Sequence, residues 1–209
     1  MMAPGERARS PSRQWLKCVQ QLGYSKASMR AWETLSRRIV FDQSPWLVVE
    51  YHQVELTDGR IIPDWTWIKT PDYINVVVET ETGQFLCFRQ LKYGVAEPML
   101  AIVGGYIEPG EAPLVTAQRE LREETGCISD EWVELGKYLV DPNRGVATGY
   151  LFLARHARKV TSIDSDDLEQ QEILFLSQVE LESALSKGEF KILAWAATVA
   201  FALRYLQKQ

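Results

Sequence analysis

The chain of 209 residues has few cysteines and histidines and no long hydrophobic run. Its three cysteines, Cys18, Cys87 and Cys127, lie far apart and form no CxxC motif, which argues against a disulfide framework. We expect buried free thiols and a reducing, cytoplasmic location. With only two histidines, His52 and His156, a zinc site built from cysteine and histidine is not expected.

The absence of a run of about 18 apolar residues argues against a membrane span. A net charge of −5 gives no support for a surface that binds nucleic acid or an anionic membrane. A nucleotide substrate stays open, because a metal ion can neutralise phosphates locally. The basic opening, MMAPGERARSPSR, lacks the apolar core of a secretory signal, and we expect it to be a flexible terminus.

What the sequence does contain is an alternation of strand and helix patterns, which we divide into three segments. Residues 1–35 are expected to hold the flexible terminus and a short amphipathic helix. Residues 36–70 are rich in strand-forming residues around Asp58-Gly59, the pattern of a hairpin in an accessory lobe. Residues 71–209 alternate strands with helices. Together these patterns predict an α/β or α+β fold with helices covering a mixed sheet.

Carboxylates are concentrated just after a glycine-rich turn in the segment GGYIEPGEAPLVTAQRELREETGC. Its second half predicts a helix over residues 113–125, which ends before Gly126, a residue suited to the left-handed position after a helix. Residues at i, i+3 and i+4 share one helix face, so we expect Glu120, Glu123 and Glu124 to lie together.

Converging carboxylates cannot all stay ionised unless a cation joins them, and oxygen ligands of high charge select Mg²⁺ or Mn²⁺. The glycines let the backbone come close, so the carbonyl at Gly104, beside Gly105, is a further candidate ligand. Arg119 is placed to pair with Glu123 and with Glu111, which would orient the acidic face. Such a metal centre would polarise a diphosphate and favour its hydrolysis. The alternative is an acidic helix that merely faces solvent.

Counting from Gly105, the fixed residues follow the spacing G-x5-E-x7-R-E-U-x-E-E-x-G-U, where U is bulky and apolar, and Cys127 at the last position is unusual. This segment resembles the Nudix box. The resemblance implies a Nudix α/β/α sandwich with a mixed sheet and an N-terminal β-rich lobe. It also implies a hydrolase that uses Mg²⁺ or Mn²⁺. The metal ligands it implies are the Gly104 carbonyl, Glu120, Glu123 and Glu124.

Outside the box, the stretches RRIVFDQSPWLVVEYHQVELTDGR and DYINVVVETETGQFLCFRQLKYG resemble the ADP-ribose/nucleotide-sugar pyrophosphatase branch of that family. In this branch a β-rich N-terminal segment helps to form a dimer, and a proline follows the box as Pro142 does here. A glutamate of a late acidic loop acts there as base or added metal ligand. The resemblance thus implies Glu169, with Glu172 as second choice, acting with Arg119 and Glu123.

The chain departs from this branch in several places. RQLK at residues 89–92 replaces R-Q-Y-R, and the usual glutamate and proline before the box are absent at Ala101 and Val103. Asn143 stands where a glycine usually follows the proline. These changes leave the catalytic class intact and make ADP-ribose a candidate substrate rather than a conclusion.

Several residues outside the box are candidates to contact substrate. Arg89, Lys92 and Arg144 are candidate phosphate contacts, and the alternative for each is a surface charge. Trp65 and Trp67 are candidates to stack on a nucleobase, and the alternative is a core or dimer contact.

We therefore expect a homodimer that hydrolyses, with Mg²⁺, the diphosphate bond of ADP-ribose or of an ADP- or GDP-sugar to a nucleoside monophosphate and a sugar phosphate. The alternatives are another Nudix substrate, such as a dinucleoside polyphosphate, NADH or an oxidised nucleoside triphosphate, or a non-catalytic sensor of nucleotide sugars. All box carboxylates are present, which argues against the sensor.

Overall fold

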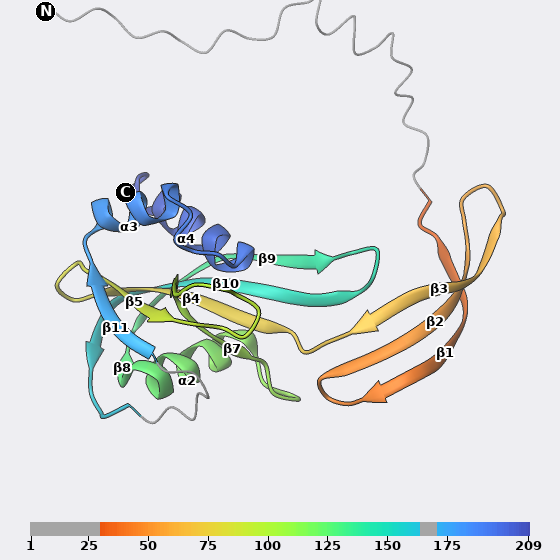
Figure 1. Ribbon diagram of the computed structural model, residues 1–209, viewed down its shortest axis with the longest axis horizontal. Coiled ribbons are helices and arrows are strands. Elements are labelled where there is room, and N and C mark those ends of the chain that lie inside the picture. The colour runs from red at the N-terminus through yellow and green to blue at the C-terminus, as the bar shows by residue number, and fades with distance from the viewer. Residues whose placement is uncertain (1–29, 164–170) are drawn as a thin grey trace, which may run out of the picture. The chain divides into compact units, whose positions relative to one another are not determined.

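The computed structural model describes residues 30–163 and 171–209 of the chain (Figure 1). The described residues fall into two compact units, one of residues 30–37 and 52–65 and the other of residues 38–51, 66–163 and 171–209. The short helix expected before residue 23, Cys18 and the loop residue Glu169 lie outside the described residues.

Three strands form an N-terminal sheet in the order β1-β2-β3: β1 (Glu33–Gln43), β2 (Leu47–Glu55) and β3 (Ile61–Lys69). The turn between β2 and β3 has Gly59 at φ 82°, a left-handed conformation that favours glycine, and the Gly59 amide donates to the Leu56 carbonyl (3.0 Å). The hairpin expected at Asp58-Gly59 is therefore confirmed.

A second, larger sheet has strands in the order β11-β5-β4-β10-β8, with β6, β7 and β9 pairing at its sides. Its strands are β4 (Tyr73–Thr80), β5 (Phe85–Gln90), β6 (Met99–Ala101), β7 (Val103–Tyr106), β8 (Cys127–Ile128), β9 (Glu131–Asp141), β10 (Val146–Lys159) and β11 (Gln171–Leu176). Strands β4 and β10 are parallel, whereas β4 is antiparallel to both β5 and β7. The expectation of a mixed sheet is confirmed.

Helices cover both faces of this sheet (Figure 1). One face carries α2 (Pro113–Thr125), and the other carries α3 (Gln178–Ser186) and α4 (Leu193–Leu206). Because helices cover both faces of the sheet, strand β4 contains an almost continuous run of apolar residues. Its Ile74, Val76 and Val78 are completely buried. The α/β/α sandwich expected from the sequence is confirmed. Among the described helices, none is long and apolar enough to cross a membrane.

The helix that carries the acidic residues ends where the sequence predicts. Pro113 occupies its first turn, and Gly126 adopts φ 70° and donates its amide to the Arg122 carbonyl. Ala117 and Leu121 of α2 are fully buried against the sheet. Helix α3 ends at Ser186, and Gly188 then turns the chain at φ 69°.

Both cysteines within the described residues, Cys87 and Cys127, are buried free thiols, as expected. Burial raises the pKa of the Cys87 thiol to about 12, so this thiol stays protonated and unreactive at neutral pH.

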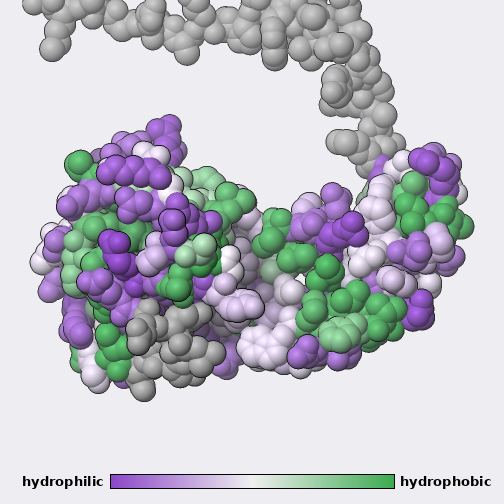
Figure 2. Space-filling model, viewed as in Figure 1, coloured by the Kyte–Doolittle hydropathy of each residue, from purple (hydrophilic) through white to green (hydrophobic). Residues whose placement is uncertain are grey.

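Hydrophobic side chains gather on part of the N-terminal sheet (Figure 2). Strand β1 of this sheet leaves the apolar residues Ile39, Val40 and Phe41 exposed.

Candidate active site

The acidic face of α2 is organised by one arginine. The Arg119 guanidinium donates to Glu120 Oε1 (2.8 Å) and Glu123 Oε2 (3.0 Å) through Nη1, and it also holds Glu111. Its Nη2 atom donates further to the Tyr106 carbonyl (3.3 Å), which ties the helix to the end of the glycine turn. The pairing of Arg119 with Glu111 and Glu123 that the spacing predicted is confirmed.

Glu111 is held more tightly than the other carboxylates. Besides Arg119, its Oε2 atom accepts hydrogen bonds from Thr116 Oγ1 (2.8 Å) and from the Glu108 amide (3.4 Å). The hydrogen bonds from Arg119, outweighing partial burial, lower the pKa of Glu111 to about 2, and those from Thr116 and Glu108 add to this. The Glu111 contacts raise the pKa of Arg119 in turn, so both groups are ionised across the physiological range.

The glycine turn is packed against the first glutamate of the helix. A Cβ atom placed on Gly105 would lie 2.0 Å from Glu120 Oε1, so only glycine leaves room for this carboxylate. A Cβ on the preceding Gly104 would lie 2.8 Å from Asn75 Oδ1. The two glycines therefore let Glu120 and Asn75 approach the backbone closely.

The acidic side chains do not converge on one point. Arg119 lies between the carboxylates of Glu120 and Glu123 and binds both. Within residues 30–163 and 171–209, no three acidic, histidine or cysteine side chains form a cluster that could hold a metal ion as they stand. Metal binding at this face would therefore require Glu120, Glu123 or both to turn away from Arg119.

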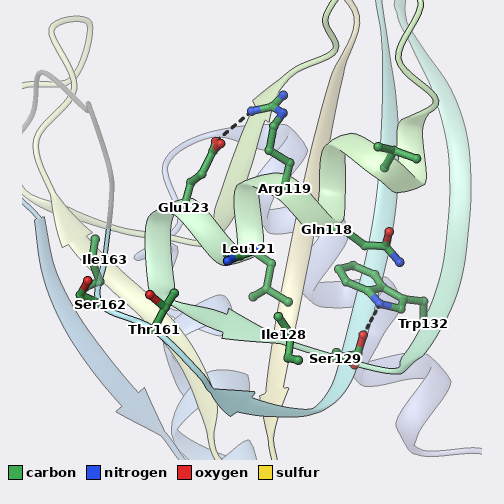
Figure 3. A pocket seen from close by; sticks show the side chains of 12 residues that line it. Gln118, Arg119, Leu121, Glu123, Ile128, Ser129, Trp132, Thr161, Ser162 and Ile163 are labelled. Carbon is green, nitrogen blue, oxygen red and sulfur yellow. Dashed lines mark hydrogen bonds and ion pairs between the residues drawn. The ribbon is translucent and has the colours of Figure 1, made fainter.

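A hollow of about 850 Å³ lies along the flank of α2 (Figure 3). It is lined by Gln118, Arg122, Ile128 and Trp132, and by Arg119 and Glu123 of the acidic face. Figure 3 shows Arg119 and Glu123 on the side of α2 away from Leu121, which points towards Ile128. Glu120 does not line this hollow, so the hollow touches the acidic face only at its edge.

Two residues singled out in the sequence meet at a distance from the acidic face. Arg89 on β5 lies opposite Glu172 on β11, and their charged groups are 3.9 Å apart. Arg89 also lines a small hollow of about 190 Å³ with Ser183 of α3, on the sheet face that α2 does not cover. The structure therefore does not bring Arg89 or Glu172 into contact with the carboxylates of α2.

The other candidate contacts are divided among several places. Lys92 is half-buried in the loop after β5, and Arg144 is exposed in the loop between β9 and β10. The Arg144 carbonyl accepts a hydrogen bond from the Ile68 amide (2.7 Å). Next to it, a Cβ on Gly145 would lie 2.0 Å from the indole of Trp67, so the Trp67 ring packs against this loop.

Trp65 has a different neighbour. Its ring meets the ring of Trp32 edge to face, with centroids 5.1 Å apart. Sequence reasoning did not single out Trp32 as its neighbour, because the two residues are paired only by the folding of the N-terminal strands. Sequence reasoning also missed Asn75, although a polar residue within the apolar run INVVV is a visible signal.

An acidic helix braced by one arginine, entered from a glycine turn on an α/β/α sandwich, defines the class of Nudix-type hydrolases. Comparison with protein families agrees: residues 69–196 match the NUDIX domain, and the chain belongs to the Nudix family. Residues 32–68 match the nucleoside diphosphate sugar hydrolase N-terminal domain. The chain is thus a Nudix hydrolase of the nucleotide-sugar type.

Curated relatives and solved structures extend this result. The ADP-ribose pyrophosphatase of Bacillus subtilis (strain 168) is 28% identical over 154 residues, which cover 74% of this chain and 81% of the relative. The methanol dehydrogenase activator of Bacillus methanolicus is 29% identical over 163 residues, covering 77% and 85%. The crystal structure of an ADP compounds hydrolase shares the fold, with a TM-score of 0.73 at 19% identity, covering 87% of this chain and 97% of that one.

Proposed function

We propose that this Nudix hydrolase cleaves the diphosphate bond of a nucleoside diphosphate linked to a sugar-like group, with ADP-ribose or an ADP- or GDP-sugar as substrate. The products are a nucleoside monophosphate and a sugar phosphate. The observation that carries the proposal is the acidic face of α2, where Arg119 binds Glu111, Glu120 and Glu123. Only a glycine at position 105 leaves room there for the Glu120 carboxylate. The relatives support the substrate class, since one is an ADP-ribose pyrophosphatase.

Nudix hydrolases as a class use divalent metal ions, and the residues of this chain fit such an ion. The proposed metal-ligand atoms are all oxygens, which suit Mg²⁺ or Mn²⁺. Because Gly105 has no side chain, the Glu120 carboxylate can lie close to the backbone of the turn. We assign Glu120, Glu123, Glu124 and the Gly104 carbonyl as the residues that hold Mg²⁺ or Mn²⁺. When bound, the ion supplies charge neutralisation on the diphosphate and a more acidic bound water.

Arg119 has the role of an orienting residue in this proposal. Its two hydrogen bonds to Glu111 leave Nη1 to bind Glu120 and Glu123, so the arginine neutralises these carboxylates until they turn towards an ion.

For the catalytic base we keep Glu169, which lies outside the described residues. Glu172, the second choice, faces Arg89 across the β5–β11 pair. That pairing gives Glu172 a local counter-charge of its own and favours Glu169 for the role.

For the substrate contacts we propose Lys92 and Arg144 as phosphate ligands and Trp65 as the residue that stacks on the nucleobase. Arg89 is less suited because its neighbour is Glu172. Trp67 is less suited because one part of its indole packs against Gly145.

We also propose that two copies of the chain form a homodimer through the N-terminal sheet. Strand β1 is exposed along its whole length, and its Ile39, Val40 and Phe41 are apolar. An exposed apolar strand edge is a typical surface for association with another chain.

One experiment tests the activity directly. The purified protein is incubated with Mg²⁺ and ADP-ribose, ADP- and GDP-sugars, NADH or diadenosine polyphosphates, and the products are identified. We expect a nucleoside monophosphate from the nucleotide sugars, and ¹⁸O-labelled water shows which phosphorus is attacked. Turnover confined to the dinucleoside polyphosphates, or binding without turnover, would contradict the proposal.

A further inference from the structure

One buried side-chain nitrogen in the main sheet has no hydrogen-bond partner among the residues that the structure describes. Asn75 on β4 is 2% exposed, and its Nδ2 is the buried side-chain nitrogen or oxygen atom without a hydrogen-bond partner within residues 30–163 and 171–209. Its neighbours along the strand, Ile74 and Val76, are apolar and fully buried. An unpaired buried N–H group lowers stability, so its presence calls for a physical reason.

The position of Asn75 provides that reason. Asn75 lies directly opposite Gly104 in the antiparallel pair of β4 and β7, and opposed residues project to the same face of a sheet. Gly104 has no side chain, and a Cβ there would lie 2.8 Å from Asn75 Oδ1 and 3.2 Å from the Ile74 carbonyl oxygen. The Asn75 amide thus fills the space that a side chain on Gly104 would take.

Because Oδ1 is turned towards Gly104, Nδ2 is left without a hydrogen-bond partner in the described part of the chain. On the opposite face, the next residue of the turn, Gly105, lies against the Glu120 carboxylate. The turn is therefore held between an amide on one face of the sheet and a metal-ligand candidate on the other.

We propose that Asn75 is a positioning residue for the glycine turn of the active site. Its amide supports the backbone of Gly104 and thereby orients the Gly104 carbonyl, the oxygen that would hold the metal ion. An alanine at position 75 removes the amide that fills the space beside Gly104 and leaves the turn unsupported. The asparagine side chain fills the space beside Gly104 with its small Oδ1 atom. The Nδ2 atom then has no hydrogen-bond partner within the described residues, which lowers stability.

This inference rests on the proposed metal site at Gly104 and α2. The test measures the Kd for Mn²⁺ of the full chain, the thermal midpoint of the metal-free protein, and kcat at saturating Mn²⁺. For Asn75→Ala we expect Mn²⁺ affinity to fall about 10- to 100-fold, the range typical for residues that orient metal ligands. The thermal midpoint should change little, because removal of an unpaired polar group offsets the cavity that alanine leaves. The kcat at saturating Mn²⁺ should approach that of the wild type.

Val77→Ala is the matched control, since Val77 is buried on the same strand and its side chain projects to the same face as Asn75. It should lower the thermal midpoint and leave Mn²⁺ affinity unchanged. If Asn75→Ala does not fold, Asn75→Ser, which keeps a small oxygen, takes its place with a smaller expected loss of affinity. Wild-type Mn²⁺ affinity in the folded Asn75 variant would overturn the inference.

Glu120→Gln separates this outcome from a failure of the proposed function. If Glu120→Gln binds Mn²⁺ as tightly as the wild type, the metal site on α2 is wrong, and the role of Asn75 falls with it. If Glu120→Gln loses affinity while Asn75→Ala keeps it, only the positioning role is overturned.

Discussion

Arg119 binds Glu111 through two parallel hydrogen bonds, from Nε to Oε1 and from Nη2 to Oε2, each 3.1 Å long. This fork-to-fork geometry is specific to arginine, because an ammonium group cannot present two coplanar donors. It joins the glycine-rich loop that contains Glu111 to the helix that contains Arg119. The remaining donor, Nη1, is then free to hold Glu120 and Glu123.

Glu120→Gln and Glu124→Gln should each lower kcat by two to three orders of magnitude or more, the range of effects that follow loss of a group that stabilises the transition state. The reason is that each change removes a charge from the proposed metal ligands while keeping the shape of the side chain. Product formation from ADP-ribose with Mg²⁺ measures the change. Glu182→Gln on α3, on the other face of the sheet, is the control and should keep wild-type activity. Near-normal turnover in Glu120→Gln or Glu124→Gln would overturn the assignment.

Arg119→Lys should destabilise the fold by about 2 kcal/mol, because lysine cannot replace a fork that serves three partly buried carboxylates. Urea unfolding measures this difference. The control is Arg158→Lys, whose partner Asp130 lies 2.8 Å away on the surface, and it should change stability by less than about 0.5 kcal/mol. Equal effects of the two substitutions would show that Arg119 is an ordinary surface ion pair.

The low pKa of Glu111 predicts a specific loss of stability in acid. Its pKa is about 2 in the folded chain against an ordinary value of 4.5, so the unfolded chain binds more protons between these values. Stability from this group is complete above pH 4.5 and is lost as the pH falls towards 2. Unfolding midpoints measured as a function of pH should therefore fall less steeply in this window for Glu111→Gln, which starts from a lower stability at neutral pH. An unchanged slope would contradict the role given to Arg119.

Two glycine substitutions should separate activity from stability. At Gly105 an alanine Cβ meets the flexible end of Glu120, so Gly105→Ala should cost about 1 kcal/mol or less and lower kcat about 100-fold by displacing that carboxylate. At Gly145 the φ angle is 71° and the Cβ meets the Trp67 ring. Gly145→Ala should therefore cost about 2–4 kcal/mol. Urea unfolding together with steady-state kinetics checks both substitutions, and a fully active Gly105→Ala would argue against close packing of the turn on Glu120.

The sequence was most informative where contacts are local. The bounds of α2 followed from the apolar period and from Gly126, and the pairing of Arg119 with Glu123 followed from the i, i+4 spacing. The hairpin at Asp58-Gly59 was equally clear, because alternation and turn residues are read within a few positions.

Sequence reasoning was weaker where strands from distant parts of the chain meet. The sequence offers Arg89 as a candidate phosphate contact, but its position opposite Glu172 follows only from the register of β5 and β11. Nothing near Trp67 in the sequence points to Gly145, and the two meet because of how β3 and the loop after β9 fold.

Sequence alone established the acidic helix face, its arginine and the family they belong to, since a helix has one fixed period and its neighbours follow from spacing. Only the tertiary structure decided which side chain packs against the glycine turn. Asn75 and Gly104 are brought together by the register of β4 and β7, which depends on the packing of the whole sheet rather than on any local run of residues.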